Sequence, residues 1–399
     1  MLKEAGSLAH AGYDVVVHAA NAGGNLNLQE DQRLAARNGF RYEPITSALR
    51  GSIFARISAV WSRLFSRMGR ELFRLFGIES HWQLGPSVAG LARAASAETA
   101  DYHIVHLEQA AWVGVKLIEA GQPVGIDFED WFSEDLTPHA RRERPLRLLR
   151  ELERSLLRGG AHATCPSRAM SDALAKAYGC FPPAVVYNAF RWSDRGALDG
   201  VLKDRKNCRV PSIHWVSQSI GPGRGLEDLF GALPLVEHPA EVHLRGTPVA
   251  GCEAWLDALV PEDWRDRVIV HRLVSNEELL SRIAEHDIGF AGEMRYCRNK
   301  ELTVSNKMFH YLLGGLVVVA SDTDGQREVA EMAQGAVLLY PSGDAAALAM
   351  QLNTLLGSPE MLASAKAAAL LAAEGTFCWE HQEGVLLEAV RRAVVASIG

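Results

Sequence analysis

One segment of the chain combines three glycines with an arginine directly after an apolar run. Residues 214–226 read His-Trp-Val-Ser-Gln-Ser-Ile-Gly-Pro-Gly-Arg-Gly-Leu. Glycine lets a backbone approach an anion closely, and the guanidinium of Arg224 can donate two hydrogen bonds to phosphate oxygens. The free amides of a helix that starts here would add positive character. The pattern indicates a phosphate site at Gly223, Arg224 and Gly225; an ordinary turn with a solvated arginine fits the same residues.

A second cluster of polar residues opens a predicted helix. Ser305 is a candidate N-cap, and Asn306, Lys307 and His310 follow in the first turns. Lys307 and His310 are three residues apart, so we expect them on one helix face. Because a predicted strand at 287–291 precedes this segment, these side chains fall where open α/β sheets bind ligands. A solvated lysine with a packed histidine is the alternative.

Three carboxylates and one histidine follow predicted strands and could serve in catalysis. Asp127 and Glu129 end one strand, and we expect them to orient an acceptor hydroxyl. His106 ends a neighbouring strand, and Glu293 follows a strand in the second half of the chain. The competing interpretations are capping for the two carboxylates, a satisfied core histidine, and a solvated loop carboxylate for Glu293.

Strand and helix patterns alternate along the chain, which predicts parallel sheets covered on both faces. The predicted strands lie at 13–17, 103–107, 124–128, 163–166, 184–187, 213–217, 241–245, 268–271, 287–291, 316–320 and 336–339. The predicted helices include 145–158, 168–178, 226–235, 276–286, 306–313, 345–356 and 359–373, besides one that opens the chain. The fold class is therefore α/β, with two doubly wound Rossmann-like domains and a cleft between them.

The domain boundaries follow from the polar, aperiodic stretch in the middle of the chain. We predict a first domain over 1–190, a linker over 191–210, a second domain over 211–375 and a returning helix over 376–399. Length and composition fit this plan, because 399 residues with 48% hydrophobic side chains can bury large cores.

Charge and cysteine content exclude several classes of function. The net charge of −7 gives no global basic field for nucleic acid. The six cysteines lack metal-ligand spacing, so we predict no metal and reduced thiols in a cytoplasmic protein. No apolar run approaches the length of a membrane span, and no signal peptide is recognised.

One predicted helix, at 53–76, has apolar residues at three- and four-residue steps and arginines on other faces. Residues 50–76 contain six arginines and one glutamate, a net charge of +5. Such a helix can lie on an anionic membrane surface, here the inner face of the membrane. A core-facing helix with a solvated basic face is the alternative.

The order and spacing of these segments resemble glycosyltransferases of the GT-B fold, in particular the retaining, nucleotide-sugar-dependent enzymes of family 4. In the second half the resemblance is carried by Arg224-Gly225-Leu226-Glu227, 276–279, 286–289, 305–315, Ser321-Asp322, Gly325, Glu328 and 377–380. In the first half it is carried more loosely by 12–15, 105–106, 127–134 and 186–189. It implies transfer of a sugar from a nucleotide sugar to a glycan or lipid-linked acceptor, with no cofactor besides the donor. A non-catalytic GT-B relative that binds or assembles is the alternative.

The resemblance assigns roles to particular positions. Arg224 matches a basic residue that contacts the donor diphosphate, whereas a second basic position in the same turn holds Gln218 or Ser219. His310 stands where the family has a glutamate that binds the ribose hydroxyls, and the first glutamate of that motif falls at Leu302. The family also opens with a strand and a glycine-rich turn before the first helix. This chain shows neither, which predicts an unpaired strand edge in the first domain.

Overall fold

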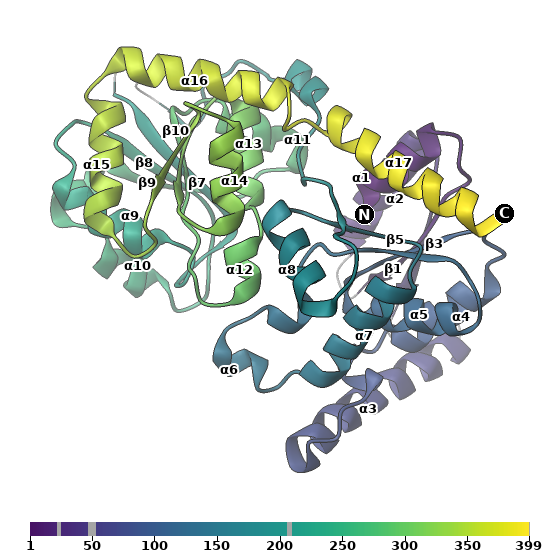
Figure 1. The fold of residues 1–399 in the computed structure, drawn as a ribbon. Helices are drawn as coiled ribbons and strands as arrows, with labels where there is room; N and C mark the ends of the chain where they lie inside the picture. The colour runs from purple at the N-terminus through teal and green to yellow at the C-terminus, as the bar shows by residue number, and fades with distance from the viewer. Residues whose placement is uncertain (22–24, 47–52, 206–209, 399) are drawn as a thin grey trace. The chain divides into compact units, whose positions relative to one another are not determined.

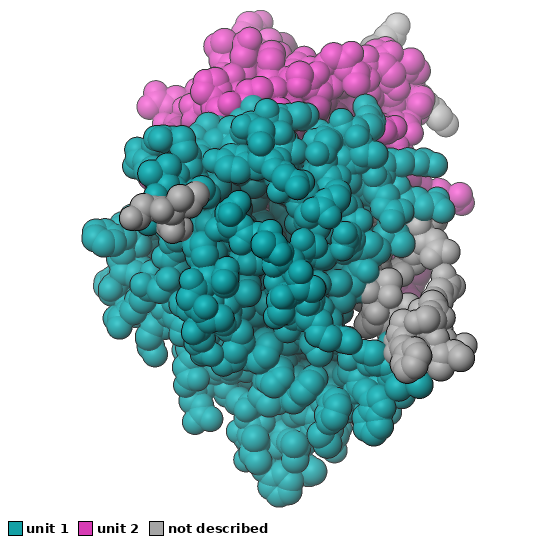
Figure 2. All heavy atoms as spheres, turned by 90° about the vertical axis from the view of Figure 1, so that its right-hand side faces the viewer, with its two compact units in different colours: residues 1–166, 170–186, 383–399 teal, residues 167–169, 187–382 magenta. Residues whose placement is uncertain are grey.

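The computed structural model describes residues 1–21, 25–46, 53–205 and 210–398. The chain divides into two compact units (Figures 1 and 2). The first unit contains residues 1–166, 170–186 and 383–399, and the second contains 167–169 and 187–382. Among the described residues, no helix is long and apolar enough to cross a membrane.

The first unit contains two parallel sheets. In one, β1 (Val16–Asn21) pairs with β2 (Arg41–Thr46). In the other, the order is β3 (His103–His106), β4 (Val124–Asp127), β5 (His162–Cys165) and β6 (Ala184–Val185). The helices of this part of the chain are α1 (Leu2–His10), α2 (Asn25–Asn38), α3 (Ile53–Phe76), α4 (Val88–Ala97), α5 (Leu107–Glu119), α6 (Pro138–Arg141), α7 (Leu146–Gly159) and α8 (Arg168–Tyr178), with short 3-10 turns η1 (His81–Leu84) and η2 (Phe132–Glu134).

The division into two sheets matches the unpaired edge that the sequence predicts. Within the described residues, β1 pairs with β2 alone and β3 pairs with β4 alone, so no ladder joins β1 to β3. The strand β4, which has neighbours on both sides, is buried at all four residues, whereas β3 is fully buried only at Val105. A parallel sheet normally buries its strands on both faces, and β3 departs from that pattern.

The second unit is built on one six-stranded parallel sheet. Its order is β12 (Val337–Tyr340), β11 (Val317–Ser321), β10 (Ile288–Ala291), β7 (Ser212–Ile220), β8 (Glu241–Pro248) and β9 (Val268–His271). The helices are α9 (Leu226–Ala232), α10 (Glu253–Leu259), α11 (Asn276–Ile283), α12 (Arg298–Leu302), α13 (Asn306–Gly314), α14 (Asp324–Met332), α15 (Ala345–Leu356) and α16 (Pro359–Glu374), with 3-10 turns η3 (Trp192–Ala197), η4 (Leu233–Leu235) and η5 (Glu262–Arg267).

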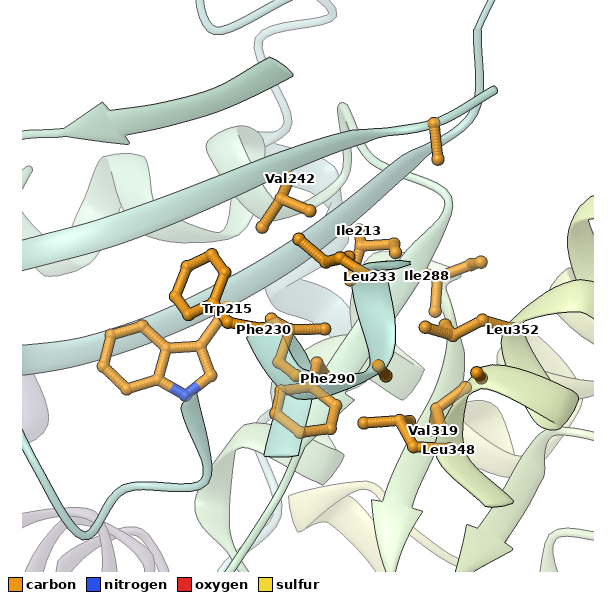
Figure 3. Close-up of a cluster of buried hydrophobic side chains, with 14 of the residues drawn as sticks. Ile213, Trp215, Phe230, Leu233, Val242, Ile288, Phe290, Val319, Leu348 and Leu352 are labelled. Atoms are coloured by element: carbon orange, nitrogen blue, oxygen red, sulfur yellow. The ribbon is translucent and has the colours of Figure 1, made fainter. Parts of the chain in front are cut away.

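The core of the second unit forms where one face of this sheet meets its helices. Ile213, Ile288 and Val319 come from three neighbouring strands, and Phe230 and Leu352 come from α9 and α15 (Figure 3). All five side chains are fully buried. The continuous apolar run at 316–320 fits this environment, because a strand covered on both faces needs no polar alternation.

Several elements were not among those predicted, and β2 and α12 show why. The strand β2 contains Pro44, a residue that argues against a strand in sequence, and its residues do not alternate clearly. The segment 292–303, for which no element was predicted, contains the five-residue helix α12, which is too short to show a helical period. The first predicted strand, at 13–17, lies instead at Val16–Asn21.

The described residues of the predicted linker and of the returning helix belong to the two compact units. In the predicted linker 191–210, η3 forms and Arg205 is 4% exposed, 2.8 Å from the carboxylate of Asp287. The last helix, α17 (Trp379–Ile398), begins in the second unit and passes into the first at residue 383. There the hydroxyl of Ser7 donates to Glu383 at 2.7 Å, which attaches α1 to α17.

Candidate functional site

Two loops meet at the carboxyl ends of β7 and β10, which are neighbours in the sheet of the second unit. Gly225 has a φ of +79°, a conformation that favours glycine. A Cβ atom at this position would lie 2.5 Å from the carbonyl oxygen of Gly292, so no larger residue fits. The glycine-rich loop after β7 is thereby held against the loop after β10.

The predicted phosphate loop is open at its tip. Arg224 is exposed, and its Nη1 donates to the hydroxyl of Ser217 at 3.0 Å, which turns the guanidinium back along β7. Gly223 has a φ of +74°, and its amide donates to Glu227 at 2.8 Å. That amide is therefore occupied by a carboxylate of the chain's own helix α9. Arg224 is the group of this loop best placed to meet an anion.

Glu293 is held firmly just after β10. Its amide donates to the hydroxyl of Ser321 at 2.8 Å, and its carbonyl accepts from Ser342 at 3.1 Å. Its carboxylate accepts from Ser305 at 2.9 Å and from Lys307 at 3.2 Å. The side chain is 17% exposed, so the interpretation as a solvated loop carboxylate is wrong.

The charges around Glu293 keep it ionised. Burial alone would raise the pKa of the Glu293 carboxyl, but Lys307, Lys300 and the Ser305 hydroxyl outweigh burial and lower it. Lys307 is itself 16% exposed, and its Nζ lies 5.5 Å from the ring centre of Trp215. The ammonium group of Lys307 therefore lies between the Glu293 carboxylate and the face of the Trp215 ring.

Local packing explains why Lys307 reaches this position. Ser305 and Gly315 flank the helix α13, and Gly315 has a φ of +78°, a common way to end a helix. A Cβ atom on Gly289 of β10 would overlap the ring of Tyr311, so glycine there lets α13 lie close to the sheet. The first turn of α13 is thereby fixed beside the end of β10.

Asn306 and His310 contact a different segment from Lys307. Asn306 accepts a hydrogen bond from Asn188 at 3.1 Å, and the His310 ring stacks on Phe190 with centroids 3.5 Å apart. Lys307 and His310, expected on one helix face, thus contact different partners. His310 is half-buried, so it is neither a fully buried core residue nor a freely solvated one.

At the position where the family motif has its first glutamate, this chain has a residue that packs in the interior. Leu302 is fully buried, and its carbonyl accepts from Ser167 at 2.6 Å. The neighbouring Glu301 is bound by Arg295 through two hydrogen bonds of 2.5 and 2.6 Å. Glu301 therefore has a local cation as its partner in this structure.

In the first unit, the predicted catalytic residues lie together. His106, Asp127 and Thr164 end the adjacent strands β3, β4 and β5 in register. His106 Nδ1 lies 3.4 Å from the Asp127 carboxylate and 3.3 Å from that of Glu129. Its Nε2 lies 3.5 Å from Glu4 at the start of α1. His106 is thus surrounded by three carboxylates and does not lie in an apolar core.

These carboxylates determine the protonation of His106. Burial would lower the pKa of the imidazole, but Glu4, Asp127 and Glu129 together raise it to about 9. Burial would raise the pKa of Asp127, but hydrogen bonds from His106 and Thr164 lower it. The hydrogen bond with His106 likewise lowers the pKa of Glu129. Burial, and next the charge of Asp127, raise the pKa of Glu4. At neutral pH His106 is therefore an imidazolium beside the ionised carboxylates of Asp127 and Glu129.

Sequence patterns did not predict three features of this cluster. Glu4 joins it from a helix that carries no motif, and the hydroxyl of Thr164 donates to Asp127 at 2.7 Å. Leu107, which follows His106 directly, has a φ of +64°, uncommon for a residue other than glycine. Backbone strain of this kind concentrates at functional sites, and here it lets β3 pass straight into α5.

Among the described residues of the first unit, two groups of side chains could hold a cation. Glu4, His106 and Asp127 offer ligand atoms within 4.8 Å of one another, and so do His18, Glu43 and Glu98. A histidine must be neutral to bind a metal, whereas His106 is held protonated by its neighbours. The first trio as arranged therefore favours a proton over a metal ion.

Comparisons with known proteins support the fold. No family model matches the chain, and no curated protein matches its sequence. The HepE protein of Anabaena, solved with UDP and glucose, is 17% identical, with a TM-score of 0.69, over 98% of this chain and 94% of that one. Sucrose-phosphate synthase of Thermosynechococcus elongatus is 14% identical, with a TM-score of 0.70, over 99% of this chain and 92% of that one. A UDP-forming trehalose-phosphate synthase of Burkholderia vietnamiensis is 13% identical, with a TM-score of 0.61, over 96% of this chain and 100% of that one. The chain therefore has the GT-B fold of glycosyltransferases, built from two Rossmann-like units.

Proposed function

We propose that the protein is a glycosyltransferase that moves a sugar from a nucleotide-sugar donor to a glycan or lipid-linked acceptor, with retention of configuration. The observation that carries the proposal is the meeting of the loops after β7 and β10, where Gly225 lies against Gly292. Similar structures were solved with UDP and with UDP-glucose. The carboxyl ends of adjacent parallel strands are where open α/β sheets bind nucleotides.

In this proposal, Arg224 and Lys307 bind the donor diphosphate. Glycosyl transfer leaves negative charge on the departing diphosphate and builds positive charge on the sugar ring. A guanidinium and an ammonium that are already in place stabilise the leaving group without reorganising at the moment of reaction. Arg224 is exposed at its loop tip, and Lys307 is held by Glu293, so both cations are positioned by their own unit.

Glu293 has two roles in the proposal. It positions Lys307 through the 3.2 Å contact, and as an ionised carboxylate it can stabilise positive charge on a nearby sugar. Asn306 and His310 contact the ribose side of the donor from the following turns of α13. A neutral imidazole can accept one hydrogen bond and donate one, which suits a hydroxyl.

The cluster of His106, Asp127 and Glu129 orients the acceptor in this proposal. An ionised carboxylate accepts a hydrogen bond from an attacking hydroxyl, and an imidazolium donates one. The acceptor is a glycan or a lipid-linked glycan. A lipid-linked acceptor requires contact with a membrane, so we propose that the protein works in the cytoplasm and peripherally on the inner membrane face.

The test is release of nucleoside diphosphate from a panel of nucleotide sugars, with and without oligosaccharide or lipid-linked acceptors. We expect release with at least one UDP-, GDP- or ADP-sugar, and slower release for Glu293→Gln, which keeps the size of the side chain but removes its charge. The exposed Glu360→Gln on α16 is the matched control. A chain that binds nucleotide but releases no diphosphate with any donor would instead be a binding protein.

A further inference from the structure

A long helix at the periphery of the first unit leaves most of its apolar surface uncovered (Figure 1). The helix is α3, and its uncovered apolar residues are between 36% and 69% exposed. They are Ile57, Val60, Trp61, Leu64, Met68, Leu72, Leu75 and Phe76. These positions recur at steps of three and four, so they form one continuous stripe, called here the apolar face of α3.

The opposite side of α3 is what attaches it to the first unit. Ala59 and Ser66 are buried, and a Cβ atom on Gly69 would lie 2.9 Å from the Cβ of Trp82 in η1. Phe65 stacks on the Trp82 ring at 4.8 Å. The helix therefore docks through small residues and one aromatic pair. The expectation of a core-facing apolar stripe is wrong, because the larger apolar residues face outward.

Basic residues run along one edge of the apolar face. Arg63, Arg67, Arg70 and Arg74 recur at steps of four, three and four, and all are exposed. Glu71 is the one acidic residue of α3, and it pairs with Arg74 at 2.8 Å. Within the described part of the chain, Arg63 and Arg67 make no ion pair.

Another arginine-rich stretch of the first unit differs from α3 in its ion pairs. Arg141 and Arg150 both pair with Glu134, at 2.9 and 3.0 Å, and Arg144 pairs with Glu108. Those arginines are neutralised by the chain's own carboxylates. The edge of α3 instead keeps a surplus of positive charge beside an exposed apolar stripe.

We infer that α3 is a docking surface for an anionic lipid bilayer, with its apolar face in the headgroup region and its arginine edge toward lipid phosphates. An amphipathic helix of this kind binds through buried apolar area plus attraction to anionic lipids. Trp61, in the N-terminal part of the stripe, has the amphipathic ring that prefers the membrane interface. Two copies of α3 packed on each other would bring like-charged arginine edges together, which disfavours a second copy as the occupant.

This inference deepens the peripheral membrane location of the proposed function, and it can be tested apart from the transfer reaction. The full chain is floated with phosphatidylcholine vesicles, with and without phosphatidylglycerol. We expect binding only to the anionic vesicles, and weaker binding as salt rises. Arg63→Gln with Arg67→Gln should weaken binding by about fivefold per arginine, equivalent to about 1 kcal/mol each.

The apolar face is tested by Leu64→Gln with Met68→Gln, which should abolish flotation. Both side chains are about half exposed, at 50% and 45%, so the fold does not depend on them. The matched control is Leu371→Gln on α16, a residue 71% exposed on the second unit, which should leave binding unchanged. Absence of binding to anionic vesicles, or equal binding by the apolar-face variant, would overturn the inference. A dimer in light scattering that this variant dissociates would assign the face to a second copy.

Discussion

At the scale of single residues, the predicted functional side chains differ in the groups that they contact. Lys307 is bound to Glu293 at 3.2 Å, and Arg224 donates to the hydroxyl of Ser217 at 3.0 Å. His106 is enclosed by carboxylates, whereas His310 lies flat on Phe190. The sequence placed these residues at the ends of predicted strands, which indicated where in the fold they would lie. They could not indicate the partners, because Glu4 and Thr164 are distant in sequence from His106 and carry no motif.

The protonation of His106 predicts how stability varies with pH. Its pKa is raised to about 9 in the folded protein, so the folded state binds this proton more tightly than the unfolded state does. The stabilisation is complete below the unfolded pKa of about 6.5 and is lost as pH rises through about 9. We expect it to amount to about 3 kcal/mol, measured as a falling melting temperature between neutral pH and pH of about 10.

The control for that measurement is His106→Gln, which keeps hydrogen bonding without a titrating proton. Its melting temperature should be lower at neutral pH and should fall less steeply over the same pH interval. Equal slopes for the two proteins would show that His106 is not held protonated by Glu4, Asp127 and Glu129.

His310 predicts the effect of restoring a carboxylate on α13. In the proposed donor site, His310→Glu would accept from both ribose hydroxyls, and charge-assisted hydrogen bonds are about twice as strong as neutral ones. We expect nucleoside diphosphate to bind more tightly by about 1 kcal/mol in calorimetry. Because His310 is half-buried, the new carboxylate keeps contact with water and the melting temperature should change little.

His310→Gln is the matched variant, since it adds no charge and should give no gain. Both variants lose the stack on Phe190, so the comparison isolates the carboxylate. A lower melting temperature of His310→Glu without tighter nucleotide binding would count against placing the ribose at α13.

At the scale of elements, strong patterns predicted structure and weak ones did not. The apolar run at 316–320 predicted a buried strand, and β11 is buried at all five residues. The glycine-rich loop was predicted because it follows such a strand. The strand β2 escaped detection because Pro44 argues against a strand in sequence. The amide of Arg41 points toward β1, so Pro44, three residues later, faces the other side of β2 and leaves the ladder intact. The outward orientation of α3 could not be predicted, because periodicity defines an apolar face but not what covers it.

The divided sheet of the first unit predicts a pattern of hydrogen exchange. The amide of Arg41 donates to Val15, so Val17 and Ala19 direct their amides toward β2, while His18 and Ala20 direct theirs away. We expect the amides of His18 and Ala20 to exchange at least tenfold faster than those of Val17 and Ala19, measured by NMR in heavy water.

The strand β3 provides the internal comparison. The amide of His103 donates to Pro123, so the amide of Ile104 points away from β4. It should exchange faster than the amide of Val105. Uniform slow exchange along both strands would mean that β1 and β3 are paired in solution, contrary to the divided sheet.

At the scale of the whole molecule, the fold and the proposed reaction rest on different kinds of support. The strand and helix alternation predicted two Rossmann-like units, and similar structures with TM-scores of 0.69 and 0.70 confirm that architecture. The donor and acceptor could not be deduced from sequence, because they depend on a few side chains whose contacts arise only on folding. Arg224 and Lys307, separated by more than eighty residues in the chain, follow the adjacent strands β7 and β10.

Nucleotide binding by these two cations is the central claim, and calorimetric titration tests it most directly. The wild-type chain, Arg224→Ala, Lys307→Ala and the exposed control Arg391→Ala on α17 are each titrated with UDP, GDP and ADP. We expect one nucleotide to bind the wild type and the control equally. Each site variant should lose about 1.5–3 kcal/mol of binding free energy, the range for a hydrogen bond to a charged group. Unchanged affinity in both site variants, or no binding of any nucleoside diphosphate to the wild type, would contradict the proposed donor site.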